Sequence, residues 1–273
     1  MVVATTGGID RRWIYLIAIL FASVSFVYPL ILPIPVSDPT RGVKEFIDTV
    51  PAGSVINIEV GFGVGMMAEL GPLIEVVSNH AFMRDLKIVY VTFEIEGPQV
   101  IESIITRVQF AEGKEYGVDY VNIGYIPGIE TGMSAWADNT NTAEVDYRGN
   151  KVSELPLMKE VSQMEDFAAV FFSTCTSPDH YFRQWATRTD ALLVAACAST
   201  VPIMAPYYQA GMVKGYIPSI RGASEYEVLL GIPGSTIRKN DAFQMLVILG
   251  FITMIASNIG FLTEKMEANE NGS

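Results

Sequence analysis

Several side chains able to do chemistry follow directly after apolar runs that have the composition of buried strands. Three glycines, Gly61, Gly63 and Gly65, follow one such run, and residues 175–180 (CTSPDH) follow another. Glycines allow a backbone to approach a phosphate closely, and a thiol, an imidazole and a carboxylate are the parts of a nucleophilic site. These two loops are the first places to look for a functional site.

Neither loop completes a known motif. The third glycine of G-x-G-x-x-G would fall at Met66, and no Lys followed by Ser or Thr closes a P-loop. Cys175, Asp179 and His180 lie within one turn, whereas partners in nucleophilic sites usually come from separate loops. Nucleotide binding and a catalytic thiol therefore stay open beside two structural roles, a tight turn made by the glycines and a side-chain cap on the helix near His180.

The segments around these loops predict an α/β domain with an open, mostly parallel, five-stranded Rossmann-like sheet. Runs of β-branched and aromatic residues alternate with segments of helical period, as in a parallel sheet covered on both faces. The expected strands are 55–60, 86–93, 120–125, 168–173 and 192–198. The expected helices are 65–84, 98–111, 157–165, 180–188, 202–210 and 223–230. Residues 126–151 are expected to form an irregular insertion or binding loop, and residues 38–42 and 231–241 to be linkers.

In such a sheet, ligands bind beyond the carboxyl ends of the strands, where helix N-termini point their free N–H groups. The first strand delivers Glu59 to this edge, and the second delivers Glu94 and Glu96. The candidate ligand crevice consists of Gly61, Gly63, Gly65, Glu94, Gly128, Glu130, Thr131, Cys175, Thr176, Asp179 and Ser199. No metal site is predicted, because the two histidines are far apart and the carboxylates lack an ordered ligand spacing. The cofactor, if there is one, stays unknown.

The segment 211–227 (GMVKGYIPSIRGASEYE) combines turn glycines with Arg221, which lies among apolar neighbours. Arg221 is followed by Glu225 and Glu227 on the next turn of an expected helix. This spacing predicts a structural ion pair at the base of the domain or a contact between subunits. Ligand binding by the same residues is the alternative.

Two long apolar runs lie near the ends of the chain and predict an integral membrane protein with two spans. Half of the residues are hydrophobic and 18% are charged, and residues 14–34 and 242–262 carry no charge. About 20 helical residues cross a hydrocarbon core of about 30 Å. A cleaved signal peptide is the alternative for the first run, and a buried core helix for the second. The expected parts are a tail (1–12), a span (13–35), the α/β domain (36–240), a second span (241–263) and a tail (264–273).

The charges beside the spans decide the expected orientation in the cell membrane. Arg11 and Arg12 favour a cytoplasmic N-terminus and so an extracytoplasmic domain, whereas Arg41, Lys44, Arg238 and Lys239 argue the reverse. The first span is taken to decide, which places the domain outside. A net charge of −12 excludes nucleic acid as a partner, because phosphate binding needs concentrated Lys and Arg. Two cysteines, at the ends of expected strands, form no disulfide framework, although one bridge between them is open.

Three short motifs carry a resemblance that covers most of the chain between the spans. These are GYIPG at 124–128, LPLMKEV at 155–161 and SIRGASEYE at 219–227. With them the chain resembles a family of uncharacterised prokaryotic, archaeal and bacterial, proteins that have two transmembrane helices around a Rossmann-like α/β domain. The resemblance implies this architecture and a prokaryotic source, and it assigns no reaction and no site residues.

Two functions from different classes remain open. The first is a membrane-anchored, non-catalytic module that acts as a structural or accessory subunit of a homo- or hetero-oligomeric complex, because no catalytic constellation is complete. The second is a membrane-bound enzyme, or a protein that binds a small molecule such as a nucleotide, in the crevice at the strand ends. An oligomeric pore has little support because neither span carries an ionisable residue. Whether the domain is an enzyme is left open.

Overall fold

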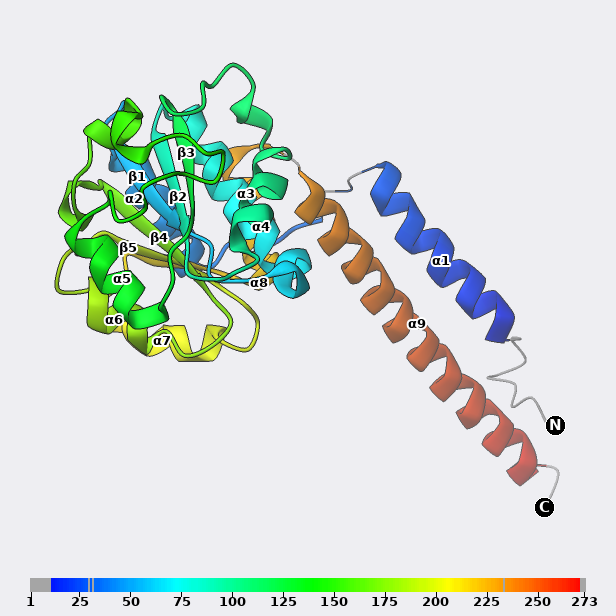
Figure 1. Cartoon of the computed structure of the whole chain (residues 1–273). Coiled ribbons are helices and arrows are strands. Elements are labelled where there is room, and N and C mark those ends of the chain that lie inside the picture. Colours follow the sequence, from blue (N-terminus) through cyan, green and yellow to red (C-terminus); the bar gives the residue numbers. More distant parts are fainter. Residues whose placement is uncertain (1–10, 29, 31, 233, 271–273) are drawn as a thin grey trace. The chain divides into compact units, whose positions relative to one another are not determined.

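The computed structural model describes residues 11–28, 30, 32–232 and 234–270, which divide into two compact units. One unit holds the two helices near the ends of the chain, and the other is the α/β domain Pro35–Ile232 (Figure 1). Most of the expected N-terminal tail, residues 1–10, and residues 271–273 of the C-terminal tail lie outside the described residues.

The α/β domain is built on one parallel sheet of six strands in the order β3-β2-β1-β4-β5-β6 (Figure 1). The strands are β1 (Val55–Glu59), β2 (Lys87–Thr92), β3 (Tyr120–Tyr125), β4 (Ala169–Thr174), β5 (Leu192–Ala196) and β6 (Gly215–Pro218). The parallel α/β prediction is confirmed, but the strand count is six rather than five. In this order the chain reverses direction across the sheet between β1 and β4, which is the position where open α/β sheets bind their ligands.

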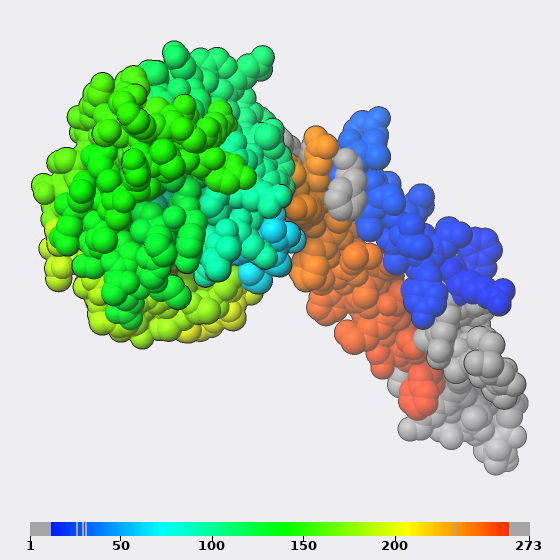
Figure 2. All heavy atoms as spheres, in the orientation of Figure 1, coloured from blue at the N-terminus to red at the C-terminus, as the bar shows by residue number. Residues whose placement is uncertain are grey.

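Helices cover both faces of the sheet, as the apolar strands require. One face packs against α2 (Asp38–Thr49), α3 (Met67–Met83), α4 (Gly97–Ile105) and α8 (Ser219–Leu230). The other face packs against α5 (Ile129–Asp138), α6 (Asp179–Trp185) and α7 (Val201–Gln209). The long connection between β3 and β4, in green in Figure 2, spreads over the side of the domain that faces the viewer.

Four local expectations are wrong, one of them the linker 231–241, because the last helix already begins at Ser235. Residues 157–165 form two short 3₁₀ turns, Leu157–Lys159 and Met164–Asp166, instead of a helix. The Asp166 carboxylate accepts hydrogen bonds from the backbone N–H groups of Ser162 at 2.7 Å and Gln163 at 3.1 Å, and these bonds favour a turn over a continuing helix. The stretch 126–151 contains the helix α5, and the expected linker 38–42 is the first turn of α2, where Pro39 fits because its missing N–H needs no partner.

In the helical unit, α9 (Ser235–Glu270) is the one helix of the described residues that is long and apolar enough to cross a membrane, over Ser235–Phe261. Helix α1 (Arg11–Val27) has 17 residues and is too short to pass the same test, so a second span is not supported. It packs along α9, and the chain after it is held by Asp241 of α9, whose carboxylate accepts the N–H groups of Leu30 at 2.9 Å and Leu32 at 3.1 Å (Figure 1).

Candidate functional site

The centre of the sheet ends in a buried glutamate. Strand β1 lies between β2 and β4, and its residues alternate between the two faces of the sheet. Ile56 and Ile58 face the core under α3, whereas Asn57 and Glu59 point to the face covered by α5 and α6. Glu59, the last residue of β1, is 0% exposed and stands at the point where the sheet order reverses. A buried carboxyl at this place needs hydrogen-bond partners or a proton.

Only one oxygen of Glu59 is satisfied by the part of the chain that the structure describes. Its Oε2 atom accepts hydrogen bonds from the Ser173 backbone N–H at 3.2 Å and from the Tyr181 hydroxyl at 3.0 Å. Its Oε1 atom is buried and has no hydrogen-bond partner among the described residues. Two residues earlier, Asn57 Oδ1 accepts the indole N–H of Trp136 at 3.2 Å, while its Nδ2 has no partner among the same residues. The same face of β1 thus presents two buried polar atoms to a ligand or to water.

The surroundings keep Glu59 neutral near pH 7. Burial is the largest effect and raises the pKa of Glu59 to about 8, helped by the nearby charge of Glu94 and opposed by the hydrogen bonds from Ser173 and Tyr181. Because Oε2 already accepts two hydrogen bonds, the proton belongs on Oε1. Burial, and then Glu59 itself, raise the pKa of Tyr181 well above its ordinary value, so this hydroxyl stays a donor. Glu59 therefore combines a fixed oxygen with a free O–H group.

A small pocket of about 70 Å³ adjoins this carboxyl at the carboxyl end of the sheet. Burial, the largest effect, lowers the pKa of His180 in its wall and favours the neutral imidazole. Glu94, in the same wall, is exposed. The described residues that line the pocket thus include two carboxyl groups, Glu59 and Glu94, and no Lys or Arg. Besides Glu59, Glu94 and His180, the lining includes Gly61, Phe93, Thr174, Thr176 and Tyr181.

Gly61 is required by the close approach of three elements at this pocket. A Cβ atom at this position would lie 2.5 Å from the Tyr181 hydroxyl oxygen and 2.6 Å from the Ser173 carbonyl oxygen. The Gly61 N–H donates to Ser173 Oγ at 2.8 Å, which ties the end of β1 to β4. The first glycine of the loop thus serves the packing around Glu59.

The rest of the glycine loop is surrounded by carboxylates. The Glu96 carboxylate accepts the Val64 N–H at 2.8 Å, and it fills the space where a Gly63 side chain would lie. Glu69, in the first turn of α3, accepts the Ala198 N–H at 2.6 Å and the Ser219 hydroxyl at 2.9 Å. In dinucleotide-binding domains this helix N-terminus binds the pyrophosphate. Here negative side chains lie around it, which disfavours a phosphate.

The remaining candidate residues are spread over other contacts. Gly128 precedes α5 with a φ of +82°, a conformation that glycine adopts readily. Glu130 pairs with Arg183, and this hydrogen bond is the main reason that the pKa of Glu130 is lowered. Thr131 lines a separate pocket of about 230 Å³ beside Tyr125. Of the predicted crevice, Gly61, Glu94 and Thr176 share the Glu59 pocket, and Gly65 is open to space.

The CTSPDH loop does not assemble a nucleophilic triad. The Asp179 carboxylate accepts hydrogen bonds from the hydroxyls of Tyr207 at 2.6 Å and Ser177 at 2.7 Å, which lower the pKa of Asp179. Burial and the neighbouring Cys197 thiol instead raise the pKa of Cys175. The cap expected for the next helix is also wrong, because α6 begins at Asp179 with Pro178 at its N-cap and no side-chain cap.

Arg221 and Glu225 form an ion pair within α8, with the Arg221 Nε atom 3.2 Å from Glu225 Oε1. The other Glu225 oxygen accepts the Ser37 N–H at 3.0 Å, the Ser37 hydroxyl at 2.6 Å and the Thr40 hydroxyl at 2.9 Å. Glu225 is 1% exposed, and Glu227 is buried as well. Glu225 thus joins α8 to the beginning of α2, which is a structural contact.

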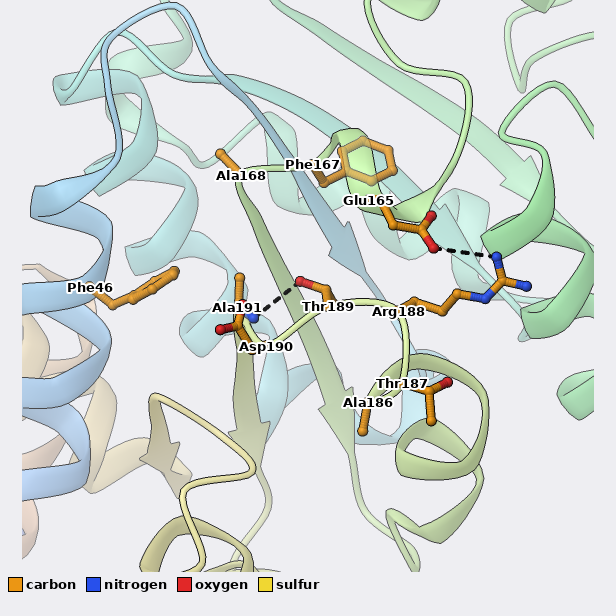
Figure 3. Close-up of a pocket in the computed structure, with 10 residues that line it drawn as sticks. All are labelled: Phe46, Glu165, Phe167, Ala168, Ala186, Thr187, Arg188, Thr189, Asp190 and Ala191. Atoms are coloured by element: carbon orange, nitrogen blue, oxygen red, sulfur yellow. Dashed lines mark hydrogen bonds and ion pairs between the residues drawn. The ribbon is translucent and has the colours of Figure 1, made fainter.

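A larger pocket of about 490 Å³ lies at the opposite, amino end of β4 and β5 (Figure 3). Phe46 of α2, Ala168 and Ala191 line it, together with the charged pair Arg188 and Glu165. Arg188 also pairs with Asp138, so its charge is already compensated. The amino ends of the strands have no helix N-termini to bind a ligand. Despite its size, this pocket offers less chemistry than the one at Glu59.

Metal binding by a cluster of protein ligands finds no support. Over the described part of the chain, no group of three or more His, Cys, Asp or Glu side chains lies close enough to hold a metal ion. The carboxylates Glu94, Glu96 and Glu130 therefore do not converge on a common metal position.

The predicted crevice omits the three residues at the centre of the site. Glu59 is named from the sequence only as a strand-end residue, and neither Ser173 nor Tyr181 is among the candidates. The available signal was a glutamate inside the apolar run VINIEV, because a charged residue in a buried strand needs a partner.

A scan of protein-family models found no match to this chain, and searches of curated proteins and of solved structures found none either. The candidate site therefore rests on the geometry of this chain alone.

Proposed function

We propose that the domain Pro35–Ile232 is a membrane-anchored receptor that binds a compact cation, an amine head group, at the Glu59 pocket. The observation that supports the proposal is the buried Glu59 Oε1 atom, which has no hydrogen-bond partner among the described residues at the point where the sheet order reverses. A buried polar atom of this kind is normally satisfied by a ligand or by water. The surrounding charges favour a cation over an anion.

The electrostatics of the pocket favour a positive ligand. Glu94 shares the pocket wall with Glu59, while the lowered pKa of His180 favours its uncharged form. An ammonium group beside Glu59 would stabilise its carboxylate, because an opposite charge lowers the pKa of an acid. Binding would therefore release the Glu59 proton, and the affinity for an amine would rise with pH until Glu59 is ionised.

The size and the aromatic lining of the pocket match a small head group. A volume of about 70 Å³ corresponds to roughly two water-sized groups, since a water occupies about 30 Å³ of liquid. Phe93 and Tyr181 line the pocket together with Glu59, and aromatic rings attract cations. A primary amine with a short carbon chain meets both conditions. A nucleotide does not, because Glu96 and Glu69 lie where its phosphates would bind.

The anchoring of the receptor is supported by the two terminal helices. Helix α9 provides the membrane span, and we propose that α1 enters the same bilayer beside it. Large apolar side chains of α1, such as Trp13, Ile19 and Leu20, are more than half exposed and would face lipid. The domain would then stand on the extracytoplasmic side, as Arg11 and Arg12 at the beginning of α1 favour.

The test is a binding measurement on the full chain in detergent. Saturation-transfer NMR with methylammonium and ethylammonium as probes is expected to give a signal at pH 8 that weakens at pH 6. The variant Glu59→Gln, which keeps the shape of the neutral acid, is expected to lose the signal. Glu165→Gln, at the larger amino-end pocket, is the matched control and is expected to keep it. A signal that survives in Glu59→Gln, or binding of phosphate in place of the amines, would contradict the proposal.

The structural or accessory role in a membrane complex stays a prediction and is compatible with a receptor. Its test is the mass of the natively purified protein. An assembly larger than one chain supports it, and a lone monomer without a partner argues against it.

A further inference from the structure

The two cysteines end neighbouring strands of the sheet and lie opposite each other. In the parallel pair β4 and β5, Thr174 is the register partner of Ala196. The next pair in the same register is Cys175 and Cys197, and the Cys197 N–H continues the ladder with a hydrogen bond of 3.1 Å to the Thr174 carbonyl oxygen. Register partners in a parallel sheet point to the same face. The two thiols therefore lie side by side.

This placement fits the geometry of a disulfide. Neighbouring strands lie about 4.8 Å apart, which is inside the range of about 4.4–6.8 Å between the Cα atoms of bridged cysteines. Both side chains pack against the same hydrophobic core, and each thiol perturbs the pKa of the other. The spacing of neighbouring strands is thus compatible with a bond between the two sulfur atoms.

The two thiols differ in acidity, as a redox pair requires. Burial, and then the hydrogen bond with Cys197, raise the pKa of Cys175. Burial by itself raises the pKa of Cys197, but hydrogen bonds from Ser199, Cys175 and Thr200 together lower it below its ordinary value. The Ser199 hydroxyl lies 3.0 Å from the Cys197 sulfur. The Thr200 hydroxyl lies 3.7 Å from the same sulfur, and its nearer acceptors are the carbonyl oxygens of Cys197 at 3.0 Å and Thr174 at 3.1 Å. Cys197, which is 2% exposed, is thus the more acidic thiol of the pair, and the thiolate is the reactive form.

We propose that Cys175 and Cys197 form a reversible dithiol–disulfide site that is oxidised by a small hydroperoxide. The Cys197 thiolate attacks one peroxide oxygen, the O–O bond breaks, and an alcohol or water leaves after taking a proton from solvent. Cys197 is then a sulfenic acid. The Cys175 sulfur displaces its hydroxyl group, loses its own proton and forms the S–S bond, and water leaves. The two sulfurs give up two electrons, which reduce the peroxide, and a dithiol reductant reverses the change.

The bond would join the loops that follow β4 and β5. Thr174 and Thr176, on either side of Cys175, line the Glu59 pocket. Oxidation would therefore hold one wall of that pocket in place. The formation of the bond itself does not depend on which ligand the pocket binds.

The test uses the full chain in detergent, reduced with dithiothreitol and then treated with one equivalent of hydrogen peroxide. The intact mass is expected to fall by two hydrogen atoms, with both thiols lost and the mass restored by dithiothreitol. This measurement needs no variant and so does not depend on whether a variant folds. Products that retain both thiols, disulfide-linked dimers or oxygen adducts without loss of two hydrogens would overturn the proposal.

Two variants assign the roles of the sulfurs. In Cys175→Ser, Cys197 is expected to stop at the sulfenic acid, which dimedone traps. In Cys197→Ser, the remaining thiol is expected to react with peroxide at least about tenfold more slowly than the wild type, because its pKa is raised. Equal rates in Cys197→Ser and the wild type, or no dimedone adduct in Cys175→Ser, would overturn the order of the steps.

Discussion

Two buried glutamates of the same domain differ in how far their oxygens are satisfied. Glu225 is 1% exposed, and both of its oxygens have partners, three donors from Ser37 and Thr40 on one and Arg221 on the other. Glu59 is equally buried, but only one of its oxygens has partners among the described residues. Burial alone therefore does not mark a functional carboxyl. What distinguishes Glu59 is its Oε1 atom, which has no hydrogen-bond partner among the described residues and so remains available to a ligand.

The largest effect on the free energy of unfolding is expected from removing the Glu225 carboxylate, whose two oxygens both have partners. Glu225→Ala leaves the N–H and hydroxyl of Ser37 and the hydroxyl of Thr40 without their acceptor at the start of α2. We expect the free energy of unfolding to fall by about 3 kcal/mol, as for the loss of one member of a buried charged network. Urea denaturation of the full chain in detergent, followed by near-ultraviolet circular dichroism, measures it.

The control for this change is Arg221→Gln. Arg221 is 64% exposed at its side chain, so its loss is expected to cost less than about 1 kcal/mol. Equal losses in the two variants would show that the ion pair, rather than the hydrogen bonds of Glu225 to Ser37 and Thr40, carries the stability.

The next effect is a dependence of stability on pH that comes from Glu59. Its pKa is raised from 4.5 to about 8 on folding, so the folded protein binds the extra proton between these values. Its stabilising contribution is complete below pH 4.5 and is lost as the pH rises toward 8, with a slope of about 1.4 kcal/mol per pH unit. Between pH 6 and pH 8 we expect the wild type to lose about 2 kcal/mol relative to Glu59→Gln. Urea curves of both proteins at the two pH values measure this difference, and parallel pH dependences would contradict it.

A smaller effect is expected from filling the space beside Glu59. Gly61→Ala places a Cβ atom 2.5 Å from the Tyr181 hydroxyl oxygen and 2.9 Å from Glu59 Oε1. We expect it to lower the free energy of unfolding by about 1–2 kcal/mol, in the range of overpacked cores. Gly65→Ala is the matched control, because nothing lies within 4 Å of its added Cβ. Differential scanning fluorimetry compares the melting temperatures of the two variants. Equal melting temperatures would show that the added methyl group at Gly61 causes no strain.

The smallest effect is expected from the second carboxylate of the pocket. The charge of Glu94 contributes to the raised pKa of Glu59, so Glu94→Gln is expected to lower that pKa by less than the burial effect raises it. Infrared titration of the protonated carboxyl band of Glu59 measures the change. Glu96→Gln serves as the control, since Glu96 bonds to Val64 and does not perturb Glu59. A larger shift of the Glu59 pKa in Glu96→Gln than in Glu94→Gln would show that Glu96, rather than Glu94, is the carboxylate that acts on Glu59.

The sequence predicts the sheet well and its connections less well. Five strands are continuous apolar runs, which identify buried parallel strands. Strand β6 is not predicted from an apolar run because it has only four residues, Gly215–Pro218, between a glycine turn and α8. Helix α2 lies close to this strand at Gly42. A Cβ atom at Gly42 would lie 2.6 Å from the carbonyl oxygen of Lys214, the residue just before β6. A contact between segments so far apart in sequence leaves no local pattern.

The candidate pocket lies at the edge of the sheet that the sequence selects, but its buried carboxyl, Glu59, is not among the predicted crevice residues. The rule for open α/β sheets selects the carboxyl ends of the strands, and Gly61, Glu94 and Thr176 do share a pocket there. The pairing of Glu59 with Tyr181 comes from α6, 122 positions away in the chain. The contact of Cys175 with Cys197 likewise depends on the register of β4 and β5. Spacing along the sequence does not determine either contact.

The most direct test of the central claim is the pKa of Glu59 with and without an amine. Infrared difference spectra of the full chain, assigned by the loss of the carboxyl band in Glu59→Gln, follow this proton. We expect a pKa of about 8 for Glu59 in the free protein and a value lower by at least about one unit with saturating methylammonium. A Glu59 that is already ionised at pH 6, or whose pKa does not change with methylammonium, would contradict it.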